Sequence, residues 1–113
     1  MPIRSLCITD SADRPSVATF IGMHEAGIEI TVVCPEDHPN HKTLTDAGVP
    51  TVDIRLPTNF NKPGIAALRE ELIRGRYHIM HTYNNKAVSN GLRACKGLPV
   101  KVVCYRGIVG AVG

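Results

Sequence analysis

The sequence predicts an α/β protein with one doubly wound parallel sheet of five strands in the order 3-2-1-4-5. Three observations lead to this prediction. Five short apolar runs rich in β-branched residues alternate with segments of helical period. Parallel neighbours in such an alternation are joined by right-handed crossovers. The 113 residues, 43% of them hydrophobic, are enough for the core of one domain.

Strands and helices are expected to alternate along the whole chain. The runs at residues 3–8, 28–33, 49–54, 77–81 and 100–105 are each too short for a helix and are bounded by turn residues. Helices with one apolar face are expected between these strands, and the helical pattern is weakest at residues 38–47. The other three faces are Val17, Phe20, Ile21 and His24; Ile65, Leu68 and Leu72; and Val88, Gly91, Leu92 and Cys95.

Proline and glycine mark the predicted helix boundaries. Asp13, Arg14 and Pro15 offer a cap followed by proline near the first turn of the first helix. A glycine is expected to close each helix before the next strand begins. These glycines are Gly27, Gly48, Gly75 and Gly97.

The charge and the cysteines exclude several classes of protein. A net charge of +3 comes from 13 basic and 10 acidic residues that are spread along the chain, so no nucleic-acid partner is predicted. There is no leader-like start and no run of about 18 apolar residues, and we expect a soluble cytoplasmic protein. The cysteines have no C-x-x-C spacing and are interpreted as small buried hydrophobes: Cys7, Cys34, Cys95 and Cys104.

The carboxyl-terminal residues do not complete the predicted architecture. Residues 108–113 read Ile-Val-Gly-Ala-Val-Gly and supply no helix to cover the fifth strand. An uncovered apolar edge strand invites pairing or aggregation. We therefore expect the natural protein to continue, with residues 1–113 as a truncated amino-terminal domain.

Common cofactor and metal motifs are absent from the sequence. There is no G-x-G-x-x-G after the first strand, no G-x-x-x-x-G-K-[ST], no D-x-D and no H-E-x-x-H. Cys34, His38 and His41 lack a fourth partner, so a solvated loop is favoured over a metal site. No cofactor and no metal are predicted.

The first candidate binding group follows the first strand. Asp10, Ser11, Ala12, Asp13 and Arg14 stand where that strand passes into a helix, and backbone N–H groups at a helix start can bind an anion or a sugar hydroxyl. Ser and Asp are also favoured there as caps alone. Both interpretations remain open.

The second candidate group follows the last two strands. His81 ends the fourth strand, and Asn84, Asn85 and Lys86 come next, a set suited to hydroxyls and phosphate oxygens. Arg106 and Gly107 follow the fifth strand and offer a planar fork beside a flexible backbone. A surface salt bridge is the alternative for the arginine. Because parallel strands end at one edge of the sheet, we expect both candidate groups to share a crevice.

The last third of the chain, HTYNNKAVSNGLRACKGLPVKVVCYRGIVG, resembles the acceptor-side domain of glycosyltransferase family 4, the retaining enzymes of GT-B fold. The earlier run DSADRPSVATFIGMHEAGIEITVVCPE is similar to that family's opening strand, helix and second strand. The resemblance implies a Rossmann-like domain over residues 1–113. It implies sugar transfer from a nucleotide-sugar to a lipid or glycan acceptor, as in lipopolysaccharide synthesis, without a metal. It also implies a separate donor domain beyond Gly113 and peripheral membrane association of the whole protein.

The resemblance also assigns roles to the candidate residues. Asp10 to Arg14 would face the acceptor and the donor phosphates. His81, as the candidate catalytic residue, would line the cleft near the transferred sugar with Asn84, Asn85 and Lys86, while Arg106 and Gly107 would shape its rim. The chain departs from many relatives at residues 11–13, where Ser-Ala-Asp replaces a glycine pair. The isolated chain is expected to be catalytically inactive.

Two other functions remain open. A phosphoacceptor receiver also has five βα units, with acidic residues at places like those of Asp10 and Asp53. However, Thr9 precedes Asp10, Asp53 is expected inside the third strand, and Arg106 stands where a receiver has lysine. A non-catalytic nucleotide-binding or scaffold module is the third hypothesis.

Overall fold

Five parallel strands form a single sheet in the computed structural model, which describes residues 3–8, 14–56, 58, 60–82 and 85–104. The strand order is β3-β2-β1-β4-β5, so the predicted fold class and strand order are confirmed. The strands are β1 (Arg4–Ile8), β2 (Glu29–Val33), β3 (Thr51–Val52), β4 (Ile79–Thr82) and β5 (Lys101–Cys104). The helices are α1 (Arg14–Glu25), α2 (His41–Asp46), α3 (Lys62–Gly75) and α4 (Asn85–Ala94).

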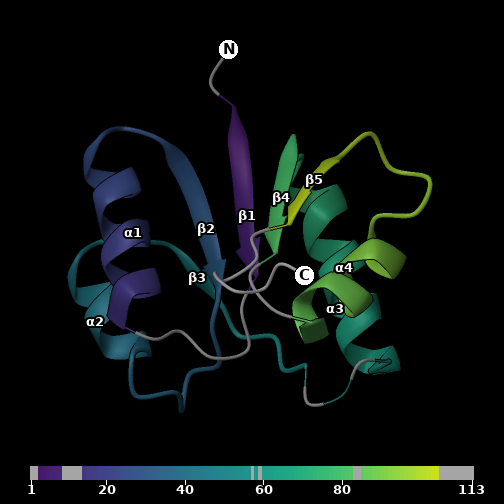
Figure 1. Cartoon of the computed structure of the whole chain (residues 1–113), viewed down its shortest axis with the longest axis horizontal. Coiled ribbons are helices and arrows are strands. Elements are labelled where there is room, and N and C mark those ends of the chain that lie inside the picture. The colour runs from purple at the N-terminus through teal and green to yellow at the C-terminus, as the bar shows by residue number, and fades with distance from the viewer. Residues whose placement is uncertain (1–2, 9–13, 57, 59, 83–84, 105–113) are drawn as a thin grey trace, which may run out of the picture.

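The helices cover the two faces of the sheet in pairs, α1 and α2 on one side and α3 and α4 on the other (Figure 1). Alternate side chains of each strand point to opposite faces, so each face has its own apolar cluster. The cluster under α1 and α2 contains Cys7, Val17, Phe20, Ile30, Val32, Cys34, Leu44 and Val49. The cluster under α3 and α4 includes Leu6, Ile8, Val33, Leu68, Leu72, Tyr77 and Met80.

The predicted apolar face of α4 is wrong at one position. Leu92 is 48% exposed, whereas Asn90 is fully buried. The Asn90 side chain accepts a hydrogen bond from the Asn61 N–H at 2.8 Å and donates one to the Thr58 carbonyl at 2.7 Å. An amide that satisfies two backbone groups can replace an apolar residue in the interior.

Asn90 also helps to position the start of α3. Its partner Asn61 is the N-cap of α3, and the Asn61 side chain accepts from the Gly64 N–H at 2.7 Å. Pro63 in the first turn fits because the first N–H groups of a helix have no intrahelical acceptor. Asn90 therefore joins α4 to the loop that begins α3.

Strand β3 is shorter than predicted. Its two residues, Thr51 and Val52, follow Pro50, and the Ile54 N–H donates to the Val52 carbonyl at 3.1 Å in a tight turn. Asp53 therefore lies just after the strand, not inside it. Its carboxylate accepts a hydrogen bond from the Glu36 N–H at 3.2 Å.

Three of the four predicted glycine terminators behave as expected, and Gly75 does not. Gly27, Gly48 and Gly97 have positive φ angles of 89°, 85° and 81°. Gly75 is instead the last residue of α3, and Arg76 takes the left-handed conformation with φ 51°. A Cβ on Gly75 would lie 2.3 Å from Cε2 of Tyr77, so close packing, not φ, requires glycine there.

Gly75→Ala is expected to destabilise the protein by about 1–3 kcal/mol, because the buried Tyr77 ring cannot move away from the new methyl group. Urea unfolding measures the change. The matched control is Gly22→Ala within α1, where nothing lies within 4 Å of the added Cβ and a gain of up to about 1 kcal/mol is expected. Equal effects of the two substitutions would contradict this interpretation.

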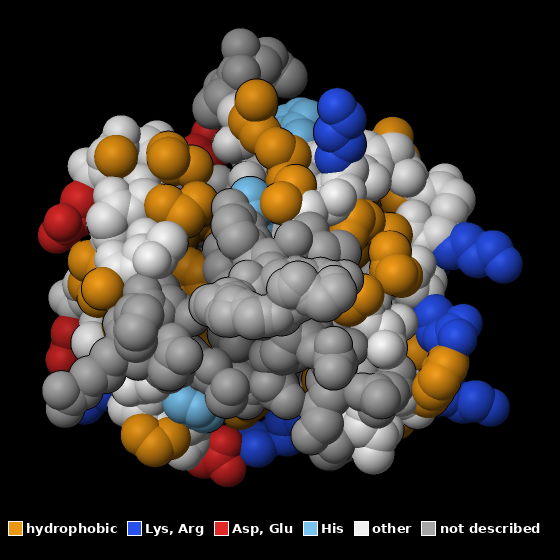
Figure 2. Space-filling view, viewed as in Figure 1, with side chains coloured by type: hydrophobic (Ala, Val, Ile, Leu, Met, Phe, Trp, Pro, Cys, Tyr) orange, Lys and Arg blue, Asp and Glu red, His pale blue; other side chains and the backbone are white. Residues whose placement is uncertain are grey.

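Charged side chains are divided between the two sides of the molecule. In the view of Figure 2, Lys and Arg project mainly on the side of α3 and α4, and most Asp and Glu on the side of α1 and α2. The small net charge of +3 therefore conceals a separation of charge on the face in view.

Candidate functional site

The ends of three neighbouring strands meet at one edge of the sheet, here named the carboxyl edge. Ile8, Thr82 and Cys104 are the last residues of β1, β4 and β5, and they are register partners across the sheet. Neighbouring strands are about 4.8 Å apart, so the three ends span about 10 Å. The segments that carry the predicted site residues all start from this short row.

The described structure contains only part of the predicted site. Arg14 is the first residue of α1, and Asn85 and Lys86 are the first two residues of α4. His81 lies in β4, one residue before its end. The remaining predicted residues lie outside the described residues: Asp10, Ser11, Ala12, Asp13, Asn84, Arg106 and Gly107.

His81 is placed within the sheet by its two neighbouring strands. Its register partners are Cys7 in β1 and Val103 in β5. In-register neighbours point to the same face, so His81 faces the side on which Cys7 packs with Val17 and Phe20 of α1. His81 is half-buried, whereas Val103 is 36% exposed.

The position of His81 determines its protonation. Burial lowers the pKa of His81 below its ordinary value, because the charged imidazolium loses solvation there. The side chain is therefore neutral at pH 7. A neutral imidazole offers one N–H donor and one acceptor nitrogen.

The next residue, Thr82, helps to hold α4 at the carboxyl edge. Thr82 is fully buried, and its hydroxyl donates to the Val103 carbonyl at 3.3 Å. Gly91 of α4 packs closely above β4, where a Cβ would lie 2.9 Å from Cε of Met80 and 3.4 Å from Cγ2 of Thr82. This close approach packs the second half of α4 against β4.

Two helices begin at the carboxyl edge. Chain order places the first turns of α1 and α4 there, after β1 and β4 (Figure 1). The first turn of a helix carries about half a positive charge and has free N–H groups. The edge is therefore suited to phosphate oxygens and hydroxyls.

The described residues contain no group of three or more His, Cys, Asp or Glu side chains that could hold a metal ion. In the loop after β2, Nδ1 of His38 accepts from the Asn40 N–H at 3.1 Å, and Nε2 of His41, the first residue of α2, lies 3.1 Å from the Thr51 hydroxyl. Burial and the nearby Asp53 raise the pKa of the Cys34 thiol. This loop therefore has the character of a hydrogen-bonded turn.

No helix among the described segments is long and apolar enough to cross a membrane.

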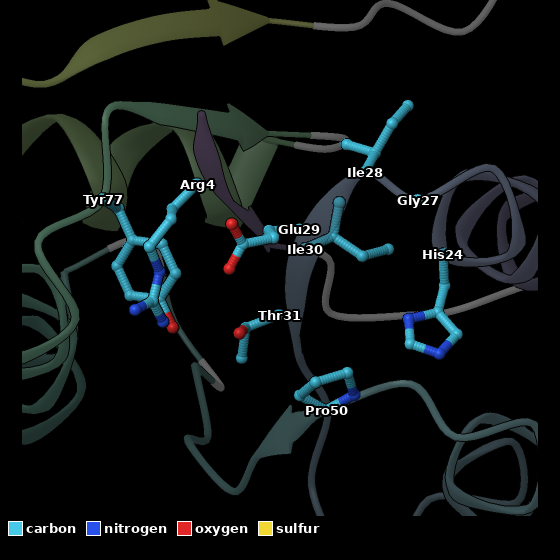
Figure 3. A pocket seen from close by; sticks show the side chains of 9 residues that line it. All are labelled: Arg4, His24, Gly27, Ile28, Glu29, Ile30, Thr31, Pro50 and Tyr77. Carbon is cyan, nitrogen blue, oxygen red and sulfur yellow. The ribbon is translucent and has the colours of Figure 1, made fainter. Parts of the chain in front are cut away.

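The sequence interpretation missed a pocket at the opposite edge of the sheet, where the strands begin. Arg4 and Glu29 open β1 and β2 there, and Tyr77 lies close to both (Figure 3). His24, expected only to pack within its helix, also lines this pocket. In the sequence, the opposite charges of Arg4 and Glu29 at the starts of two apolar runs were the feature that could have indicated this pocket.

No protein-family model matches the chain, and no curated protein matches its sequence. Solved structures share its fold. MurG of Acinetobacter baumannii matches with a TM-score of 0.72 and 12% identity over 96% of this chain and 37% of MurG. A glycosyltransferase of Rickettsia africae ESF-5 matches with a TM-score of 0.72 and 12% identity over 91% of this chain and 29% of that chain.

These similarities define the class of fold. The parallel sheet in the order 3-2-1-4-5 matches the amino-terminal domains of GT-B glycosyltransferases, of which MurG is one. The chain spans well under half the length of either solved glycosyltransferase. At 12% identity the likeness shows the fold alone.

Proposed function

We propose that this chain forms the amino-terminal, acceptor-side part of a glycosyltransferase that moves a sugar from a nucleotide-sugar to a lipid or glycan acceptor. One observation carries the proposal: the ends of β1, β4 and β5 lie in a row at the carboxyl edge of a GT-B-type sheet. Ligands of doubly wound sheets bind outside the carboxyl ends of their strands.

Within this proposal, the residues around the carboxyl edge have different binding roles. His81 binds the transferred sugar through its neutral imidazole, and Asn84, Asn85 and Lys86 contribute hydroxyl and phosphate contacts. The group from Asp10 to Arg14 faces the acceptor and the donor phosphates. Arg106 and Gly107 complete the rim.

The finer features of the proposal come from the resemblance to family 4. The enzyme would transfer the sugar with retention of configuration and without a metal. A second domain would hold the nucleotide, and the whole protein would act at the cytoplasmic side of a membrane. Stabilising a departing nucleoside diphosphate is mainly electrostatic and needs several fixed donors in a cleft. The site residues of this chain supply only part of that set, so the second domain must supply the rest.

In the structure, one feature of this chain is closer to a phosphoacceptor receiver than expected, but two residues that a receiver requires are still replaced. Asp53 follows β3, which is nearer to a receiver's phosphoacceptor position than the sequence interpretation placed it. However, the Asp53 carboxylate bonds the Glu36 backbone and lies 3.9 Å from a guanidinium nitrogen of Arg55. Arg106 still replaces the required lysine, and Thr9 still replaces an acidic residue.

Sugar-transfer assays test the proposal. The protein encoded by the complete gene is expected to transfer labelled sugar from one of a panel of nucleotide-sugars to a lipid or glycan extract. The 113-residue chain alone is expected to transfer none above a no-protein control, because within the proposal a second domain holds the donor nucleotide. Incubating this chain with a labelled small phosphodonor is expected to leave it unlabelled. Transfer by the isolated chain, or phosphorylation of Asp53, would overturn the proposal.

A further inference from the structure

A pocket of about 240 Å³ lies at the edge of the sheet where the strands begin, opposite the proposed sugar-transfer cleft. We name it the amino-edge pocket. Both an acidic and a basic side chain line it, together with an aromatic ring and apolar groups (Figure 3). Its residues are Arg4, His24, Gly27, Ile28, Glu29, Ile30, Thr31, Pro50 and Tyr77.

The pocket exists because β3 starts late. Pairing between β2 and β3 begins at Val32, whose N–H donates to the Pro50 carbonyl at 2.9 Å. The first part of β2 therefore has no strand on that side among the described residues. The backbone groups of Ile30 point the same way as those of Val32, because strand geometry repeats every two residues. An open strand edge is thus part of the pocket wall.

Two opposite charges face this pocket without pairing. Arg4 and Glu29 are register partners on adjacent parallel strands, so their side chains leave the sheet on the same face. The ion pairs within 4.0 Å among the described residues involve neither of them. The Arg4 guanidinium instead lies over the Tyr77 ring, 5.2 Å from its centroid. Both charged groups therefore remain open to a ligand.

The Tyr77 ring is a fixed platform for Arg4. Tyr77 is only 5% exposed, and its hydroxyl donates to Oε2 of the buried Glu71 at 2.8 Å. Arg74 bonds the other oxygen of the same carboxylate. A guanidinium stacked on an aromatic ring keeps its in-plane N–H donors, which match a carboxylate in a two-point contact.

We propose that the amino-edge pocket binds a small zwitterion, an α-amino acid with an apolar side chain. Its carboxylate bonds the Arg4 guanidinium, and its ammonium bonds the Glu29 carboxylate. The side chain lies toward Ile30 and Pro50, which line the pocket away from Arg4 (Figure 3). By comparison with a cavity near 150 Å³ that admits benzene, this pocket has room for about ten non-hydrogen atoms.

The test is an NMR titration of the full chain with L-leucine and two analogues. Leucinamide lacks the carboxylate and N-acetyl-leucine lacks the ammonium, so each is expected to bind at least about tenfold more weakly. L-leucine is expected to give saturable shifts at the amino edge. Equal binding of either analogue, or no saturable shift up to about 10 mM, would overturn the proposal.

Substitutions locate the binding on the protein. Arg4→Gln and Glu29→Gln are each expected to weaken L-leucine binding at least about tenfold. The matched controls Lys96→Gln and Glu70→Gln remove one exposed charge of each sign outside the pocket and should leave it unchanged. If both pocket variants bind as wild type does, the assignment is wrong. If a variant fails to fold, the binding of leucinamide and N-acetyl-leucine to the wild-type protein tests the proposal instead.

Discussion

Replacing Asn90 by alanine is expected to lower the free energy of unfolding by about 2–4 kcal/mol. The substitution leaves the Asn61 N–H and the Thr58 carbonyl without their side-chain partner. A buried backbone group without a partner costs about 1–3 kcal/mol, and the two hydrogen bonds lost here are part-buried. Loss of contacts around a side chain with 0% exposure adds to this. The melting temperature should fall by roughly 10 °C or more.

Ser89→Ala is the matched control for Asn90→Ala, because it changes a neighbouring polar residue of α4 that is only partly buried. Its effect is expected to stay within about 0.5 kcal/mol. Urea unfolding of the two variants beside wild type gives both values. An Asn90→Ala protein as stable as Ser89→Ala would mean that the loop before α3 does not depend on this amide.

The order of strands and helices was predictable because it depends on local periodicity. The runs around β1 and β2 alternate with the apolar face of Val17 and Phe20, and both of these residues are buried as expected. A parallel sheet then follows from the general handedness of crossovers. Predicting the order of the strands and helices therefore needed little knowledge of contacts between distant residues.

The failed predictions depend on particular contacts, one of them between residues far apart in the chain and two between residues only two positions apart. Asn90 is buried because it bonds the loop at residues 58–61, about 30 positions earlier in the chain. Gly75 is required by the Tyr77 ring, and β3 is short because the chain turns at Asp53. Hydrophobic periodicity reports neither a side-chain packing contact nor a turn, so it could not reveal them.

The sequence predicts which strand ends the candidate site residues follow, and the site itself stays a prediction. Polar residues after apolar strands indicated the carboxyl edge, and His81 does lie beside the end of β4. Its orientation toward the α1 face depends on the register with Cys7, which the sequence does not reveal. The amino-edge pocket was missed because Arg4 and Glu29 resemble ordinary polar residues at strand boundaries.

Replacing His81 by asparagine in the protein encoded by the complete gene is expected to lower kcat/KM for sugar transfer about 100-fold. The imidazole is half-buried and neutral, so within the proposal it binds the reacting sugar from a fixed position. Loss of one such preorganised polar group typically costs a factor of about 10² to 10³ in rate. Asparagine has a similar size and polarity, so the fold should tolerate the change.

The most direct test of the account compares sugar transfer by wild type, His81→Asn and His78→Asn, with thermal unfolding as the control for folding. His78 is an exposed histidine just before β4, at the opposite end of that strand. We expect a loss of about 100-fold for His81→Asn and a wild-type rate for His78→Asn. Folded His81→Asn protein that transfers sugar at the wild-type rate would contradict the claim that the carboxyl edge is the reaction cleft.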